Sequence, residues 1–138
     1  VKGEERDGMF YTPEMSRRAR IIELWAALKY LGRKGVGELV ETMHHRATQF
    51  KNEISKVAGF EVLNNVVFNQ VLVQCGTDDL TQTTLFNIQQ ERVCWVGGSQ
   101  WKNRKVIRVS ICSWATTKDD ISKAVASFKK SLAKAKKQ

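Results

Sequence analysis

The sequence lacks the motifs on which self-contained active sites are commonly built. It has no phosphate-binding glycine loop with a lysine, no nucleophile elbow and no paired carboxylates in a setting typical of acid–base catalysis. Gly97 and Gly98 form an isolated pair, which we interpret as a β-bulge rather than a ligand loop. We therefore expect any chemistry of this protein to depend on residues outside the chain.

Long apolar runs and paired cysteines are also absent. No apolar run approaches the roughly 18 residues that span a bilayer, and the N-terminus has no apolar segment typical of a signal peptide.

Cys75, Cys94 and Cys112 form no CxxC pair, so we expect reduced, buried thiols in a cytoplasmic protein rather than a zinc site. His44 and His45 have no further histidine at a metal-binding spacing, and no metal role is assigned to them. The chain does not begin with Met, which fits a processed protein and a fragment equally well.

Basic residues dominate the charge. Lys and Arg number 23 against 14 Asp and Glu in 138 residues, which gives a formal net charge of +9. Basic domains often bind nucleic acid. The predicted strands lack the aromatic pattern of an RNA-binding sheet, however, and the lysine-rich segment 129–137 is typical of a solvated helix end. A free-standing basic α+β module that binds RNA or an acidic partner is therefore the alternative function that the sequence leaves open.

The first half of the chain is expected to contain two helices. Residues 1–11 form an irregular lead-in, and Thr12-Pro13 starts a helix that continues to about Leu31. This helix is apolar nearly all round, so we expect its burial to need a partner surface. Gly32 ends it, and a second helix with a regular apolar stripe extends over residues 36–57.

The second half is expected to contain four strands and two helices. They are predicted as strands at 60–63 and 66–75, a helix at 78–92, a hairpin at 93–114 and a helix that begins after Thr117. A capping box of Thr117 and Asp120 supports the start of that helix. The order α-α-β-β-α-β-β-α predicts an α+β fold, in which a small, mostly antiparallel sheet has helices on one face. No predicted element is left to cover the other face, so another body of protein is expected there.

The hairpin carries the single candidate binding residue, Arg108. Ile107, Val109 and Ile111 alternate with it along the second strand and are expected to face the helices, with Arg108 on the opposite face. A guanidinium among small and apolar neighbours is costly unless an anion meets it. One interpretation pairs Arg108 with a carboxylate of its own chain or leaves it solvated, and the other makes it an anion-binding residue.

Three segments of the sequence resemble one enzyme family. PEMSRRARIIELWAALKYLGRKGVGELVE contains an arginine cluster, Trp25 and a Leu31-Gly32-x-x-Gly35 turn, and FEVLNNVVFNQVLVQC and VCWVGGSQWKNRKVIRVSICSWATTKDDI follow it in order. They resemble the entry helix, the first two strands and the last hairpin of the small C-terminal domain of group II pyridoxal-phosphate-dependent amino acid decarboxylases. That family includes the aromatic amino acid, histidine and glutamate decarboxylases and has the fold of the aspartate aminotransferase superfamily. The resemblance covers residues 12–128.

The resemblance implies that this chain is part of a larger enzyme. Residues 1–11 would be a lead-in, 12–32 an interdomain helix and 33–138 the small C-terminal domain. The cofactor, pyridoxal 5'-phosphate, would be held by a lysine in a large upstream domain, because the sequence has no His-Lys dipeptide. The implied partners are that large domain, an amino acid substrate and a second subunit in a homodimer, with no nucleic acid and no membrane. This chain alone, without catalytic or cofactor-binding residues, is expected to be inactive.

The resemblance also implies a role for Arg108. In related enzymes the arginine on this strand is placed to meet the substrate carboxylate. A forked guanidinium matches a carboxylate through two hydrogen bonds, and decarboxylation depends on holding the scissile bond perpendicular to the cofactor ring. An aminotransferase of the same cofactor fold is a third possibility, and the spacing from the arginine cluster to Trp25 favours a decarboxylase.

Overall fold

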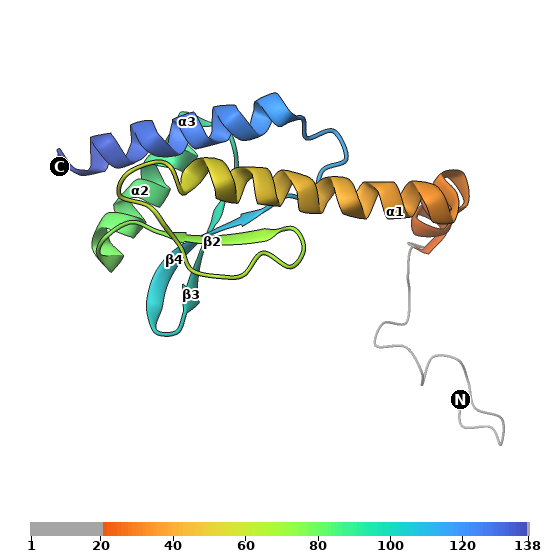
Figure 1. The fold of residues 1–138 in the computed structure, drawn as a ribbon, viewed down its shortest axis with the longest axis horizontal. Helices are drawn as coiled ribbons and strands as arrows, with labels where there is room; N and C mark the ends of the chain where they lie inside the picture. The colour runs from red at the N-terminus through yellow and green to blue at the C-terminus, as the bar shows by residue number, and fades with distance from the viewer. Residues whose placement is uncertain (1–20, 138) are drawn as a thin grey trace, which may run out of the picture. The chain divides into compact units, whose positions relative to one another are not determined.

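The computed structural model describes residues 21–137, and this part of the chain contains three helices and four strands (Figure 1). Contacts divide the chain into two units, Val1–Val36 and Gly37–Gln138. The lead-in predicted for residues 1–11 and the helix start at Thr12-Pro13 lie outside the described residues. No described helix is both long enough and apolar enough to cross a membrane.

Helix α1, Ile21–Ile54, accounts for both helices predicted in the first half of the chain. Gly32 interrupts its helical geometry with φ 63° and ψ −179°, a conformation that glycine adopts without steric cost. The break lies where the sequence predicts the end of the first helix. On the N-terminal side of the break, the large apolar side chains are exposed, and they comprise Ile21, Ile22, Leu24, Trp25, Leu28 and Leu31.

The four strands form one antiparallel sheet, which confirms the predicted sheet type. They are β1 Glu61–Val62, β2 Gln70–Gln74, β3 Gly97–Trp101 and β4 Arg104–Ser110, in the spatial order β1-β2-β4-β3. The register pairs every residue of β3 with one residue of β4. Gly97 and Gly98 are therefore ordinary strand residues, and the bulge interpretation is wrong.

Helices α2, Asp78–Glu91, and α3, Lys118–Ala135, begin at the residues that the sequence predicts. The Thr77 hydroxyl accepts a hydrogen bond from the Leu80 N–H at the start of α2. At the start of α3, the Asp120 N–H donates to the Thr117 hydroxyl and the Thr117 N–H donates to the Asp120 carboxylate. The capping box predicted from the sequence is thus confirmed, with Asp in the position that Glu usually occupies.

The core lies between the helices and one face of the sheet (Figure 1). Ile107, Val109 and Ile111 of the β4 segment are buried there, as the alternation predicts. Phe50 of α1 and Phe128 of α3, both fully buried, pack beside them. Each such side chain stabilises the fold by about 1.5–3 kcal/mol through burial alone. The helices therefore cover one sheet face, which confirms the predicted α+β arrangement.

Two predicted strands are shorter than the sequence suggests. Residues 66–69 form a loop before β2. Next to this loop, the Asn64 side-chain amide accepts a hydrogen bond from the Leu72 N–H and donates one to the Gln70 carbonyl. Residues 93–96 also lie outside the sheet, and the Val96 carbonyl accepts a hydrogen bond from the Gln89 side chain instead of a strand partner.

Candidate binding site on the far face of the sheet

The sheet face opposite the helices, here called the far face, carries Arg108. The register and the alternation of side chains assign to this face Glu61, Gln70, Leu72, Gln74, Gly97, Ser99, Trp101, Arg104, Val106, Arg108 and Ser110. The prediction that Arg108 lies opposite the core-facing side chains of β4 agrees with this register.

Arg108 occupies the middle of the far face. It is paired with Leu72 of β2 on one side and with Gly97 of β3 on the other. Leu72 and Val106 are 9% and 2% exposed, so the floor beside the guanidinium stem is apolar and dry. Gly97 has no side chain, and no atom lies within 4 Å of the position that its Cβ would take. The exposed Arg108 side chain therefore has free space beside it on the β3 side.

Among the described residues, the far face contains one ion pair, and Arg108 is not part of it. Arg104 Nη2 lies 2.7 Å from Glu61 Oε2 and satisfies that carboxylate. Among residues 21–137, no carboxylate or hydrogen-bond acceptor meets the Arg108 guanidinium. The interpretation that pairs Arg108 with a carboxylate of its own chain finds no support in this part of the chain. A solvated guanidinium and an anion-binding guanidinium remain, and the arrangement suits an anion such as a carboxylate.

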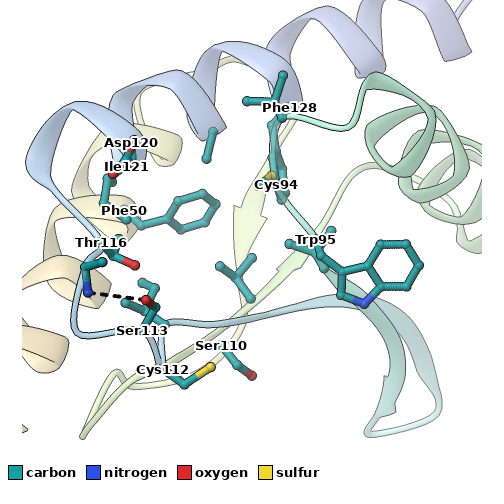
Figure 2. Close-up of a pocket in the computed structure, with 16 residues that line it drawn as sticks. Phe50, Cys94, Trp95, Ser110, Cys112, Ser113, Thr116, Asp120, Ile121 and Phe128 are labelled. Carbon is teal, nitrogen blue, oxygen red and sulfur yellow. Dashed lines mark hydrogen bonds between the residues drawn. The ribbon is translucent and has the colours of Figure 1, made fainter.

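A hollow of about 460 Å³ lies next to this face, where the ladder between β3 and β4 ends (Figure 2). Segment 93–96 and segment 109–116 diverge here and leave part of the core accessible. The rings of Phe50 and Phe128 lie on the α3 side of the hollow, and Ser110 and Cys112 lie on the opposite side. The lining is mainly apolar, so the hollow is suited to binding rather than to proton transfer.

The titratable groups of the hollow are not arranged for catalysis. The Asp120 carboxylate accepts from the Thr117 N–H at 2.9 Å and from the Thr117 hydroxyl at 2.7 Å, so it is engaged in capping α3. These two bonds hold the pKa of Asp120 below its usual range. Burial raises the pKa of the Cys94 thiol, which disfavours the thiolate that nucleophilic attack needs.

The other candidate residues form no site. All three cysteines are free, but only Cys75 is buried, so the expectation of buried thiols is wrong for the exposed Cys112. His44 Nδ1 lies 3.0 Å from the Phe68 carbonyl oxygen, a contact that fits a structural role. No group of three potential metal ligands occurs among the described residues.

The chain was compared with protein families and with solved structures. No protein-family model matches it. Oryza sativa TDC with PLP and tryptamine matches with a TM-score of 0.82 and 17% identity, over 93% of this chain and 29% of that one. Catharanthus roseus tryptophan decarboxylase in complex with L-tryptophan matches with a TM-score of 0.77 and 13% identity, over 86% and 26%.

A bacterial structure shows the same similarity. It is the glutamate decarboxylase domain of diaminobutyrate-pyruvate transaminase and L-2,4-diaminobutyrate decarboxylase from Vibrio parahaemolyticus, with a TM-score of 0.76 and 13% identity over 91% of this chain and 28% of that one. At these identities the similarity concerns the fold. The chain spans less than a third of the length of each of these three structures. The predicted resemblance to pyridoxal-phosphate-dependent decarboxylases is confirmed at this level.

The described residues do not fit pyridoxal phosphate. That cofactor requires a lysine for its Schiff base and a charged partner for its ring nitrogen, together with a phosphate site. The 460 Å³ hollow is lined by no lysine or arginine. A second hollow of about 390 Å³ is lined by Lys56, Lys129 and Lys136 but by no carboxylate. A third hollow, of about 310 Å³, has lysines beside Glu91, but that carboxylate is already paired with Lys130. A cofactor site in the whole protein would therefore need residues from outside this part of the chain.

Sequence reasoning did not find the hollow beside the far face. Segment 93–96, with its valines, cysteine and tryptophan, has the composition of a strand, and only the observed divergence from segment 109–116 creates the space. The two tryptophans of these segments are the one signal in the sequence. Trp95 and Trp114 are 80% and 81% exposed in the structure, and exposed large aromatic side chains often mark a binding surface.

Proposed function

We propose that residues 33–138 are the small C-terminal domain of a pyridoxal-phosphate-dependent amino acid decarboxylase, that 12–32 is its interdomain helix, and that Arg108 binds the substrate carboxylate. The observation that carries this proposal is the exposed Arg108 guanidinium, which has no partner among the described residues and stands beside the free space at Gly97. The similarity in fold to decarboxylases supports the assignment of the domain. The cofactor lysine, the rest of the active site and a second subunit would come from outside this chain.

Arg108 is suited to orienting a carboxylate. Its backbone is held by strands on both sides, at Leu72 and at Gly97, so the base of the side chain is fixed in a central strand. The dry floor of Leu72 and Val106 lowers the local dielectric constant and strengthens an interaction with an anion. A planar guanidinium can make two parallel hydrogen bonds to one carboxylate, which fixes orientation as well as position.

Two substitutions of Arg108 in the intact enzyme test this role. Arg108→Lys keeps the charge and loses the planar fork, and Arg108→Met also loses the charge. Both should lower kcat/KM, Met by the larger factor, because a lost charge-assisted bond of about 1.5–3 kcal/mol corresponds to roughly ten- to more than a hundredfold. Binding of the cofactor should be retained in both variants.

Arg104→Met is the matched control. It removes a guanidinium from the same strand and the same face, but one that is already paired with Glu61. Its kcat/KM should remain close to that of the unmodified enzyme, with a small loss of stability. Lowered Tm with unchanged kcat/KM in both Arg108 variants would show that Arg108 is structural and would refute its role in binding substrate.

The chain alone should be inactive under this proposal. The purified chain would be mixed with pyridoxal phosphate and a panel of amino acids, and CO2 release would be measured. No release is expected, because neither the 460 Å³ hollow nor the 390 Å³ hollow combines a lysine with a carboxylate. In a hollow of about 310 Å³ that does combine them, Glu91 is already paired with Lys130. Sustained turnover that one point substitution in this chain abolishes would contradict the proposal.

Binding of RNA is the second candidate function, and one observation favours it. Lys56, Lys129 and Lys136 surround one hollow, and none of the three has an ion pair among the described residues. If these lysines bind phosphates, the logarithm of the association constant for RNA should fall linearly with the logarithm of the salt concentration. Lys129→Gln should make this dependence on salt less steep. Absence of RNA binding at low salt would leave the decarboxylase proposal as the sole function.

A further inference from the structure

The ladder between β3 and β4 ends at Gly97, but the segment that contains β4 continues beyond that point. Gly97 is the last residue of β3 that pairs with β4. On the opposite side β4 still pairs with β2 at Ser110, and the Ile111 N–H donates a hydrogen bond to the Asn69 carbonyl. In the described part of the chain, no strand lies on the β3 side of residues 110–112, and the 460 Å³ hollow opens there (Figure 2).

One backbone acceptor and one backbone donor point from this segment away from β2. The Ile111 N–H donates to the Asn69 carbonyl and the Ile111 carbonyl accepts from the Asn69 side chain, so both groups of Ile111 face β2. In a trans peptide the C=O and the N–H point in opposite directions, and the described residues contain no cis peptide bond. The Ser110 carbonyl and the Cys112 N–H therefore point to the β3 side, where neither has a hydrogen-bond partner among residues 21–137.

The lining of the hollow suits an uncharged ring. Ile111, which faces the core, forms part of one wall, and Phe50 and Phe128 lie on the α3 side (Figure 2). No lysine or arginine lines the hollow. Its one carboxylate, Asp120, already accepts two hydrogen bonds from the cap of α3, and burial raises the pKa of the Cys94 thiol, which favours its neutral form. An anionic group would lose its hydration here without gaining a counter-ion.

We propose that this hollow binds an uncharged, peptide-like small molecule in which an apolar ring stands between two amide groups. With the molecule extended beside β4, the ring lies opposite Ile111, on the same face, and enters the hollow. The carbonyl of one amide accepts a hydrogen bond from the Cys112 N–H, and the N–H of the other donates to the Ser110 carbonyl. Extended peptides add to a sheet edge in this way, with hydrogen bonds from the backbone and selection of a side chain by a pocket.

The inference goes beyond the proposed function, because neither Arg108 nor a cofactor takes part. Arg108 pairs with Gly97 inside the ladder, whereas the molecule lies beyond the end of the ladder, opposite Ile111. It leaves the free space beside Gly97 open. Every group that the binding needs belongs to the described part of the chain. The 138-residue chain itself is therefore sufficient for the test, and a negative result would leave the role proposed for Arg108 unchanged.

N-acetyl-L-phenylalaninamide carries these groups and is the probe. Its binding to the 138-residue chain would be followed by NMR titration, with chemical-shift changes expected in segments 93–96 and 109–116. N-acetyl-L-phenylalanine has a charge in place of the terminal amide, and N-acetyl-L-alaninamide lacks the ring. Each should bind at least about tenfold more weakly than the probe.

Three results of this titration would overturn the proposal. They are absence of binding by the probe, equal affinities for the three compounds, and chemical-shift changes confined to residues 21–31. The last result would mean that the ring binds the exposed apolar side chains at the start of α1 and not the hollow.

Cys112→Pro tests the hydrogen bond from the backbone. It removes the N–H that points to the hollow and breaks no hydrogen bond among the described residues. The dissociation constant of the probe should rise by about three- to tenfold. Cys112→Ala keeps the N–H and should leave the constant nearly unchanged, and circular dichroism confirms that both variants are folded. An unchanged constant for Cys112→Pro refutes the binding mode.

Ala124→Leu tests the hollow without altering the backbone. Ala124 is 9% exposed and lines the hollow from α3, so a leucine side chain would fill part of the space that the ring needs. Binding of the probe should be lost. Ala126→Leu changes an exposed position of the same helix outside the lining, and Arg108→Met removes the guanidinium of the far face, so both should bind the probe as the unmodified chain does. Retained binding in Ala124→Leu, or its loss in Arg108→Met, would place the probe elsewhere and overturn the proposal.

Discussion

Phe50 and Phe128 pack edge to face, with ring centroids 5.3 Å apart and planes at 72°, and they join α1 to α3 in the second unit. Both side chains are fully buried, and Phe60 lies 5.8 Å from Phe128 on another side. Edge-to-face packing brings the positive edge of one ring to the negative face of the other, a contribution beyond that of burial. This contact therefore anchors the core beneath the sheet.

Phe128→Ala should be among the most destabilising single substitutions in the chain. It removes a fully buried ring and leaves a cavity beside Phe50, and such changes cost about 3–5 kcal/mol. Phe86→Ala is the control, because Phe86 lies on α2 and is 60% exposed, and it should change the free energy of unfolding by less than about 0.5 kcal/mol. Urea unfolding of the two variants measures both values. Equal losses would mean that Phe128 is not part of the core.

Local signals in the sequence predicted the helices and the alternation of β4 well. The Thr117–Asp120 capping box and the glycine at position 32 act within a few residues, so the sequence alone contains the information. Ile107 and Val109 face the core as predicted. Side chains alternate between the two faces of a strand, so the apolar set must lie on the buried face.

Contacts between distant residues decided what the sequence could not predict. Residues 66–69 have the composition of a strand, but they form a loop before β2, and the side chain of Asn64 hydrogen-bonds to the backbone of Gln70 and Leu72. The ion pair of Arg104 with Glu61 joins residues 43 positions apart, and it is this pair that leaves Arg108 without a carboxylate on the far face. The candidate site could thus be named from the alternation of β4, whereas its electrostatic state required the structure.

Gly59→Ala should destabilise the chain. Gly59 has φ +97°, and an added Cβ would lie 3.0 Å from Leu132 Cδ2, so both the backbone and the packing resist a side chain. A residue other than glycine that is held in such a conformation lowers the free energy of unfolding by about 1–3 kcal/mol. Gly37→Ala is the matched control, because Gly37 is helical and no atom lies within 4 Å of its Cβ position. It should stabilise the chain by about 0.5–1 kcal/mol, and opposite signs in urea unfolding confirm the prediction.

The three cysteines should react with a thiol reagent in a fixed order. Cys112 is exposed and should react first, and the buried Cys75 should react last, at a rate set by opening of the fold. Cys94 should fall between them, because it is partly buried and burial raises the pKa of its thiol. Mass spectrometry of samples labelled for increasing times gives the order. Labelling of Cys94 before Cys112 would contradict the described exposure of the two residues.

Asp120 should make the stability of the chain depend on pH in the acid range. Hydrogen bonds from the Thr117 N–H and then the Thr117 hydroxyl hold the pKa of Asp120 below its usual range. A pKa lowered by folding means that the unfolded chain binds the proton more readily. Asp120 therefore contributes stability above its unfolded pKa of about 3.9, and the contribution is lost as the pH falls through the folded pKa.

Asp120→Asn isolates this contribution. The difference in free energy of unfolding between the unmodified chain and Asp120→Asn should be largest at neutral pH and should shrink below about pH 4, where the carboxylate takes up its proton. Asp119→Asn, which removes the neighbouring exposed carboxylate and its pair with Lys123, is the control for the loss of one negative charge near the start of α3. Urea unfolding at pH 7 and pH 3 measures the four differences. Only Asp120, and not Asp119, accepts the Thr117 N–H. If the loss in free energy of unfolding caused by Asp120→Asn were the same at both pH values, the stability of the capping box would not depend on the charge of the Asp120 carboxylate.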